Sequence, residues 1–496
     1  MLRRRISIPI IIIWGLILTQ AISTVFVYFS NADLYRTMEI LNNAGYLIVP
    51  NEHIINRLHE FGPAFRGGLF FTLSLGSSLT LVSLLIGLIW TRLSKQRKIP
   101  VITLCLIQVL CLAEINKNGP CIIESLYFIF VPLGVFIAAI RLLPQNIKAE
   151  HRIHPLIHII PLLILSVLWL SQMSKDIFVD LRDNFLLSNP VGIKINSFYY
   201  GYTLYPAGAF KTLKQKLIKT CNLEEVENPG AGKRLKHMLI RFDYLETKNN
   251  EQIDLKIIQK GNDLMFQNRG RVILSTSIEG FLKNPGRTLD SFSMMCDRHG
   301  FLRKAVYFSL LIGFPVILYI FLYSCLCFIL SLFINNRISS YIVSTCGLII
   351  GVLMLVPIYK SNSIVIDINN LGKILESENR FERIGALKLI ARKGFDITEY
   401  ESYTKNVESS YVPEIYWAVK ALGNSRSPRA FDDLILTLDS PYSNVVCMAY
   451  YSLGRKGDKR AVDVILKRIR TSNHWYRQWY AYRALRNLGW KQRTSN

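Results

Sequence analysis

Long apolar segments are the main pattern along this chain. Seven of them approach the length of about 20 residues that an α-helix needs to cross a bilayer. They lie near residues 7–29, 69–91, 99–115, 121–141, 155–171, 305–333 and 338–360, and the third and fifth are short and interrupted by polar groups. The pattern predicts a multi-pass α-helical membrane protein, with five spans within residues 1–171 and two more within residues 305–360.

Basic residues are distributed unevenly around the predicted spans. Lys and Arg are enriched in cytoplasmic loops, so their positions indicate an orientation. They cluster before the first span and after the second and fourth, at Arg3, Arg4, Arg5, Arg92, Lys95, Arg97, Lys98, Arg141, Lys148 and Arg152. We therefore expect a plasma or inner membrane location with a cytoplasmic N-terminus. Residues 172–304 and the C-terminal region are then extracytoplasmic, although one miscounted span would reverse the side of the C-terminal region.

Residues 172–304 are too long and too patterned to be a linker. We expect a helix over 207–221, and strands over 238–245, 253–259 and 270–277 that are separated by turn-forming residues. The interpretation is a small α+β domain outside the membrane. Cys221 and Cys296 share this region, and an oxidising compartment would allow a disulfide between them. Two free, buried thiols fit the sequence equally well.

Residues 364–496 contain a repeat with a fixed period. Four similar helical patterns follow one another at spacings of 32, 31 and 32 residues, and they are marked by Ala386, Ala418, Ala449 and Ala481. A second helix repeats after 31 residues, since the pattern that begins at Pro428 returns at Lys459. Such a period is typical of stacked helix pairs whose core forms between neighbouring repeats. We therefore expect a C-terminal α-solenoid.

These motifs resemble HEAT repeats of the short phycobilisome-lyase type. Gly457-Asp458-Lys459-Arg460-Ala461, followed by an apolar helix, is close to the pattern of that family, whereas the preceding copy has Ser427-Pro428 in place of Gly-Asp. The resemblance covers about a quarter of the chain. It implies a solenoid used for protein–protein contact, and it implies neither chromophore attachment nor a catalytic residue.

The last repeat is rich in Trp, Tyr and Arg, the residue types enriched at interface hot spots. The candidate partner-binding residues are Trp475, Tyr476, Arg477, Trp479, Arg483, Arg486 and Trp490. Alternatively, Trp475 and Trp479, one helical turn apart, close the end of the solenoid core. Residues 441–496 hold 12 Lys and Arg against 2 Asp and Glu. This excess suits an acidic protein, an anionic lipid or a merely solvated basic face, and we expect no nucleic-acid partner outside the cell.

Ionisable residues near the spans are candidates for an intramembrane polar site. Glu114 and Glu124 flank the hairpin between the third and fourth spans, and His154 and His158 lie one turn apart at the fifth span. The carboxylates could hold an ion or a proton, and the histidines a metal or haem. Lys117 lies beside the glutamates, and no matching histidine pair occurs on another span. We therefore expect no metal and no cofactor.

The overall composition favours a membrane protein without a recognisable reaction. Half of the 496 residues are hydrophobic, 19% are charged, and the formal net charge is +24. The chain contains no Walker-type loop, GxSxG elbow, HExxH motif or Rossmann fingerprint.

The leading hypothesis is a non-enzymatic envelope scaffold or accessory subunit that binds a protein partner through its repeats. The alternative is a transporter or permease subunit that uses the membrane helices as a pathway. A membrane enzyme, the third hypothesis, would need clustered acid/base residues in the outer loops, such as Asp180, Arg182 and Asp183 facing residues 30–68.

Overall fold

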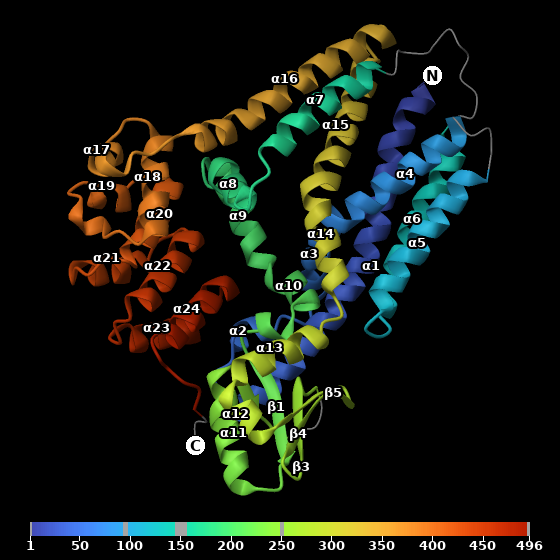
Figure 1. The fold of residues 1–496 in the computed structure, drawn as a ribbon. Helices are drawn as coiled ribbons and strands as arrows, with labels where there is room; N and C mark the ends of the chain where they lie inside the picture. The colour runs from blue at the N-terminus through green and yellow to red at the C-terminus, as the bar shows by residue number, and fades with distance from the viewer. Residues whose placement is uncertain (1, 93–97, 144–155, 249–251, 494–496) are drawn as a thin grey trace.

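Long apolar helices form a bundle in the upper part of the molecule (Figure 1). The computed structural model describes residues 2–92, 98–143, 156–248 and 252–493. Six helical segments among these residues are long and apolar enough to cross a membrane, by length and composition. They are α1 (Leu2–Asn43), the run of α3 (Phe61–Phe71), η1 (Thr72–Gly76) and α4 (Ser77–Arg92), α5 (Ile99–Asn116), α6 (Ile122–Leu142), the run of α14 (Gly300–Phe308), η5 (Ser309–Gly313) and α15 (Phe314–Leu330), and α16 (Asn336–Ser363). The fifth predicted span corresponds to α7 (Leu156–Ser171), which is apolar but shorter.

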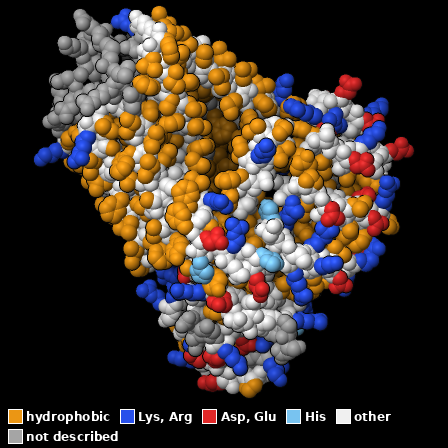
Figure 2. Space-filling view, turned by 180° about the vertical axis from the view of Figure 1, so that it is seen from behind, with side chains coloured by type: hydrophobic (Ala, Val, Ile, Leu, Met, Phe, Trp, Pro, Cys, Tyr) orange, Lys and Arg blue, Asp and Glu red, His pale blue; other side chains and the backbone are white. Residues whose placement is uncertain are grey.

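The outer surface of the bundle is apolar. Figure 2 shows hydrophobic side chains over most of this surface, whereas charged side chains gather over the other parts of the molecule. Val109 of α5 and Leu353 of α16 are 61% and 62% exposed, respectively. Soluble monomers rarely expose contiguous apolar surface of this extent, so the bundle is consistent with a membrane protein.

Small residues allow the helices of the bundle to approach closely. A Cβ atom at Gly76 in η1 would collide with Thr19 of α1, and one at Gly313 in η5 would collide with Ser78 of α4. Buried hydroxyls in the same region, including those of Ser23 and Ser74, donate to the backbone carbonyl one turn earlier in their own helix. These buried hydroxyls therefore have hydrogen-bond partners within their own helices and can lie in the contacts between helices.

A five-stranded mixed sheet lies at the opposite end of the molecule from the N-terminus (Figure 1). Its strand order is β2-β1-β3-β4-β5. The strands are β1 (Lys219–Glu225), β2 (Tyr244–Glu246), β3 (Leu255–Lys260), β4 (Asp263–Asn268) and β5 (Arg271–Ser277). β1 pairs in parallel with β2 and β3, and the other pairs are antiparallel. Phe266 of β4 shares a buried cluster with residues of α11 (Pro229–Arg241), α12 (Ile278–Lys283) and α13 (Pro285–Met295).

Local structure in this domain differs from the sequence-based expectation in two places. The first half of the predicted strand over 238–245 is the end of α11, because Asn228 caps this helix and Pro229 occupies its first turn, and strand β2 begins only at Tyr244. Leu235 and Leu239, one turn apart, give this helix its buried face. The predicted helix over 207–221 ends at Phe210, in α10 (Leu204–Phe210), and the chain then enters β1 at Lys219. The strands predicted over 253–259 and 270–277 correspond to β3 and β5.

The C-terminal region consists of helix pairs arranged in two layers. Consecutive contacts join α18 (Arg380–Lys393), α20 (Val412–Leu422), α22 (Ser443–Lys456) and α24 (Trp475–Asn487), which form the inner layer. The outer layer contains α17 (Leu371–Leu375), α19 (Tyr403–Val407), α21 (Arg429–Thr437) and α23 (Ala461–Thr471). Gly394 and Gly457 end α18 and α22 with positive φ angles, as expected for a left-handed helix end.

Candidate functional site

The inner layer of the repeats is covered by the chain itself. Residues 177–202, here called the clasp segment, comprise α8 (Ile177–Leu181), η3 (Arg182–Leu186) and α9 (Pro190–Tyr202). All seven residues of α22 from Asn444 to Tyr450 are buried, so this half of the helix is covered on every side. An inner helix of an open solenoid would leave one face exposed to solvent.

Each inner helix makes a polar contact with the clasp segment, in chain order. Lys388 of α18 donates to Asp180 at 3.1 Å, and the Trp417 indole of α20 donates to Asp183 at 2.9 Å. The Asn196 amide donates to Asn444 of α22 at 2.6 Å, and the Trp475 indole of α24 donates to the carbonyl of Tyr200 at 2.9 Å. The clasp segment therefore runs along the solenoid from its first repeat to its last.

Asp183 is the most highly connected of these side chains. Its carboxylate accepts from Arg182 at 2.6 Å and lies 3.2 Å from the Lys388 ammonium. The Arg182 guanidinium also lies over the Tyr416 ring, 3.9 Å from the ring centroid. These charges are almost completely removed from water and balance one another, as buried charges must. Asp180, Arg182 and Asp183 therefore contact one another and the repeats, and do not form the example cluster with residues 30–68 that the sequence suggested.

A second contact joins the last repeat to the segment after α1. The Asn51 side-chain amide donates to the carbonyls of Ile469, Arg470 and Ser472 at 2.9–3.1 Å, where α23 ends. These carbonyls have no partner within their own helix, so Asn51 caps α23 from a distant part of the chain. Gln492 and Leu47 exchange two further hydrogen bonds, at 2.8 and 3.1 Å.

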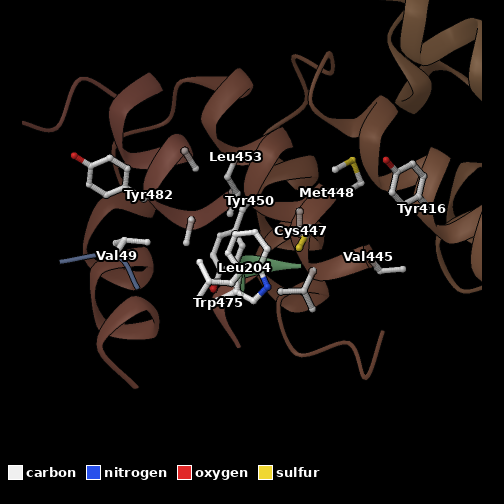
Figure 3. Close-up of a cluster of buried hydrophobic side chains, with 14 of the residues drawn as sticks. Val49, Leu204, Tyr416, Val445, Cys447, Met448, Tyr450, Leu453, Trp475 and Tyr482 are labelled. Atoms are coloured by element: carbon white, nitrogen blue, oxygen red, sulfur yellow. The ribbon is translucent and has the colours of Figure 1, made fainter. Parts of the chain in front are cut away.

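The apolar core is continuous across these contacts. Val49 and Leu204 lie beside α22 and α24 in a single cluster of buried side chains (Figure 3). The same cluster contains Trp475 and Tyr482 of α24. The repeats are therefore packed against the rest of the molecule, and they are not a separate domain connected to it only through α16.

Most of the predicted partner-binding residues contact the chain itself. Arg486 pairs with Asp243 at 2.9 Å, and Trp490 packs against Tyr482. Tyr476 packs against the Tyr200 ring, and Arg477 donates to Ser443. Trp475 and Trp479 line a cavity, and Arg483 is exposed over the Trp479 ring.

A cavity of about 990 Å³ lies where α1, the α5–α6 hairpin, the sheet domain and α24 meet. Its walls combine apolar side chains, such as Phe29 and Leu34, with charged ones, such as Arg269 and Arg298. Lys211 lies over the Trp475 ring in this cavity. Burial, and to a smaller extent the positive charge of Lys216, lower the pKa of Lys211 to about 8.

Three potential metal ligands meet in the wall of this cavity. The donor atoms of Cys121, Glu124 and His299 all lie within 4.8 Å of one another. His299 Nδ1 is 3.3 Å from Glu124 Oε1. Burial lowers the pKa of His299 to about 4, so its imidazole is neutral near pH 7 and available as a ligand. The sequence pointed to Glu124 as a candidate but not to the other two residues. His299 is distant in the chain, and the Cys-x-x-Glu spacing of Cys121 and Glu124 is not by itself a metal-binding motif.

Among the side chains that the structure describes, the two acids of the predicted intramembrane site, Glu114 and Glu124, lie in different environments. Glu114 is exposed on α5, whereas Glu124 is buried in the cavity wall. The proposed His154 and His158 pair lies outside the side chains that the structure describes. Cys221 and Cys296 are free thiols that belong to the core of the sheet domain.

Comparison with known families identifies one part of the chain. Residues 409–486 match the family model of HEAT repeats. No curated protein and no solved structure matches the chain. The C-terminal region is therefore a HEAT repeat region, of a kind that generally serves as a protein-interaction module or scaffold.

Proposed function

We propose that this protein is a membrane-anchored scaffold of the cell envelope. Its apolar helices cross the membrane, with α7 completing seven crossings. The sheet domain and the HEAT repeats share the extracytoplasmic side. The contacts of the repeats with the clasp segment and with Asp243 support a common side for both domains.

The observation that carries the proposal is the covered inner layer of the repeats. HEAT repeats usually recognise partners through an extended concave surface. Here the clasp segment occupies that position. A partner must therefore bind elsewhere on the repeats.

The surface that remains is strongly basic. Eight of the 12 Lys and Arg residues after position 440 are exposed, and we call them the basic end: Arg455, Lys459, Arg460, Lys467, Arg470, Arg483, Lys491 and Arg493. Asp463 is the exposed acid among them. This charge favours an acidic protein, because complementary charge accelerates association and excludes basic partners.

The test is photo-crosslinking in intact cells with the full chain. A crosslinking residue at position 463 is expected to form a protein adduct that the double variant Lys467→Glu, Arg470→Glu abolishes. The matched control is Lys373→Glu, Lys393→Glu, which reverses exposed charges on the first repeat and should leave the adduct unchanged. An adduct with lipid alone, or a protein adduct that survives the first double variant, would contradict the proposal.

A further inference from the structure

The Cys121, Glu124 and His299 cluster has the composition of a transition-metal site. Thiolate and imidazole ligands favour Zn²⁺ over Mg²⁺ or Ca²⁺, which prefer oxygen ligands alone. Thiolate and carboxylate together carry two negative charges, which balance a divalent cation. We propose that these three residues bind a Zn²⁺-class ion at the edge of the cavity.

The geometry of the two closest ligands fits such an ion. His299 Nδ1 and Glu124 Oε1 lie 3.3 Å apart. Two ligands on one tetrahedral zinc, with bonds of about 2.0–2.1 Å, are separated by roughly 3.3 Å. Cys121 Sγ lies within 4.8 Å of both ligand atoms, and a rotation of its side chain closes the remaining distance.

The ligands are held by a surrounding network of hydrogen bonds. Asn116 accepts from the backbone N–H of Cys121 at 2.8 Å and thereby fixes the start of α6. Asn118 donates to the carbonyl of Asp297 at 2.8 Å, which ties the α5–α6 hairpin to the segment that carries His299. Asp297 also accepts from the His299 backbone N–H at 3.1 Å. Metal sites generally depend on such partners beyond the ligands to fix the positions of the ligands.

Three protein ligands leave one coordination position for another molecule. All three line the cavity of about 990 Å³, so this position opens into it. Open sites with three protein ligands are typical of zinc that acts on a bound molecule, whereas structural sites are closed by four. Arg269 and Arg298 line the same cavity and oppose a cation, so they favour an anionic group as the fourth ligand.

The experiment uses the full chain, purified in detergent, treated with chelator and then titrated with Co²⁺. Cobalt bound to a thiolate gives a ligand-to-metal charge-transfer band, which reports directly on cysteine ligation. We expect one equivalent of Co²⁺ to produce this band and Zn²⁺ to displace it. Cys121→Ser should remove the band, and Glu124→Gln and His299→Ala should each weaken Co²⁺ binding by at least about tenfold.

Cys296→Ser is the matched control, because this thiol lines the same cavity outside the cluster. It should leave both the band and the affinity unchanged. Thermal unfolding of the metal-free variants shows whether each one folds like the parent chain. Persistence of the band in Cys121→Ser, loss of the band in Cys296→Ser, or no Co²⁺ binding at micromolar concentration would overturn the proposal.

Discussion

Single buried side chains determine how firmly the repeats are held on the clasp segment. Asp183 receives hydrogen bonds from Arg182 and from Trp417, and it also faces Lys388. Removing one partner of a buried ion pair leaves the others uncompensated, which costs far more than losing a surface pair. The stability of the docked repeats therefore depends more on the buried charged residues of this interface than on the exposed ones.

The first prediction compares a buried and an exposed carboxylate of the same interface. Asp183→Ala should destabilise the docked repeats by about 3–5 kcal/mol, since it leaves the buried Arg182 without its carboxylate and the Trp417 indole without its acceptor, whereas Lys388 keeps Asp180. Asp176→Asn should cost at most about 1 kcal/mol, because Asp176 and its partner Arg392 are 48% and 51% exposed at the side chain. Hydrogen exchange of the α20 and α22 amides measures both effects. Equal effects for the two variants would contradict this account of Asp183.

The second prediction concerns His474 at the start of α24. Burial, and to a smaller extent the positive charge of Arg477, lower the pKa of His474 to about 4. Both ring nitrogens are buried without a hydrogen-bond partner among the described residues. The unfolded chain, with a histidine pKa near 6.5, binds more protons than the folded chain between pH 6.5 and pH 4, so stability falls as pH drops through this window.

Acidification to pH 4 should therefore cost on the order of 2–3 kcal/mol through His474. His474→Leu should remove this part of the pH dependence, as measured by the thermal midpoint at pH 7 and pH 4.5. His237→Leu, at an exposed position of α11 in the sheet domain, is the control for replacing a histidine outside the repeats. An unchanged pH dependence in His474→Leu would show that other groups dominate the acid response.

Among the helices and strands, those that pack against segments close to them in the sequence could be predicted from the sequence. The period of 31–32 residues indicated the repeats, because each helix pair packs on its neighbour. The apolar segments likewise indicated the long helices. The start of β1, up to Cys221, was assigned to a helix instead, because the pairing of β1 with β2 and β3 depends on residues distant in the chain.

The contacts of the candidate sites could not be predicted from the sequence either, because they also join residues that are distant in the chain. Trp475 and Arg486 were identified by residue type, but their partners Tyr200 and Asp243 lie more than 200 positions away. Residue type indicated an interface, whereas only the fold shows that this interface lies within the chain. The Cys121 cluster likewise depends on His299, which α14 brings to the hairpin.

The third prediction concerns α23, whose C-terminal carbonyls are capped by Asn51. Asn51→Ala leaves three carbonyls without this donor and should cost about 1–3 kcal/mol. Hydrogen exchange should rise in α23 and α24 before it rises in α18. Asn487→Ala, at an exposed position of the last repeat, should have no such effect. Uniform exchange across all repeats in Asn51→Ala would contradict this local role.

For the chain as a whole, the account requires the sheet domain and the repeats to lie on the same side of the membrane. Lys260→Cys and Glu376→Cys, at exposed positions of the two domains, should both react with a membrane-impermeant maleimide on intact cells. Asn335→Cys, in the turn before α16, should react only after permeabilisation. Labelling of Glu376→Cys only after permeabilisation would mean that one apolar helix does not cross.

The central claim is that the clasp segment occupies the inner layer of the HEAT repeats, and a thiol crosslink tests it most directly. The side chains of Asn196 and Asn444 meet at 2.6 Å. In a Cys447→Ser background, Asn196→Cys with Asn444→Cys should crosslink within one chain in native membranes, detected by mass spectrometry of the linked peptides. The pair Asn196→Cys with Glu376→Cys should not crosslink. No link between positions 196 and 444, or a link only between two chains, would show that the repeats do not close over their own clasp segment.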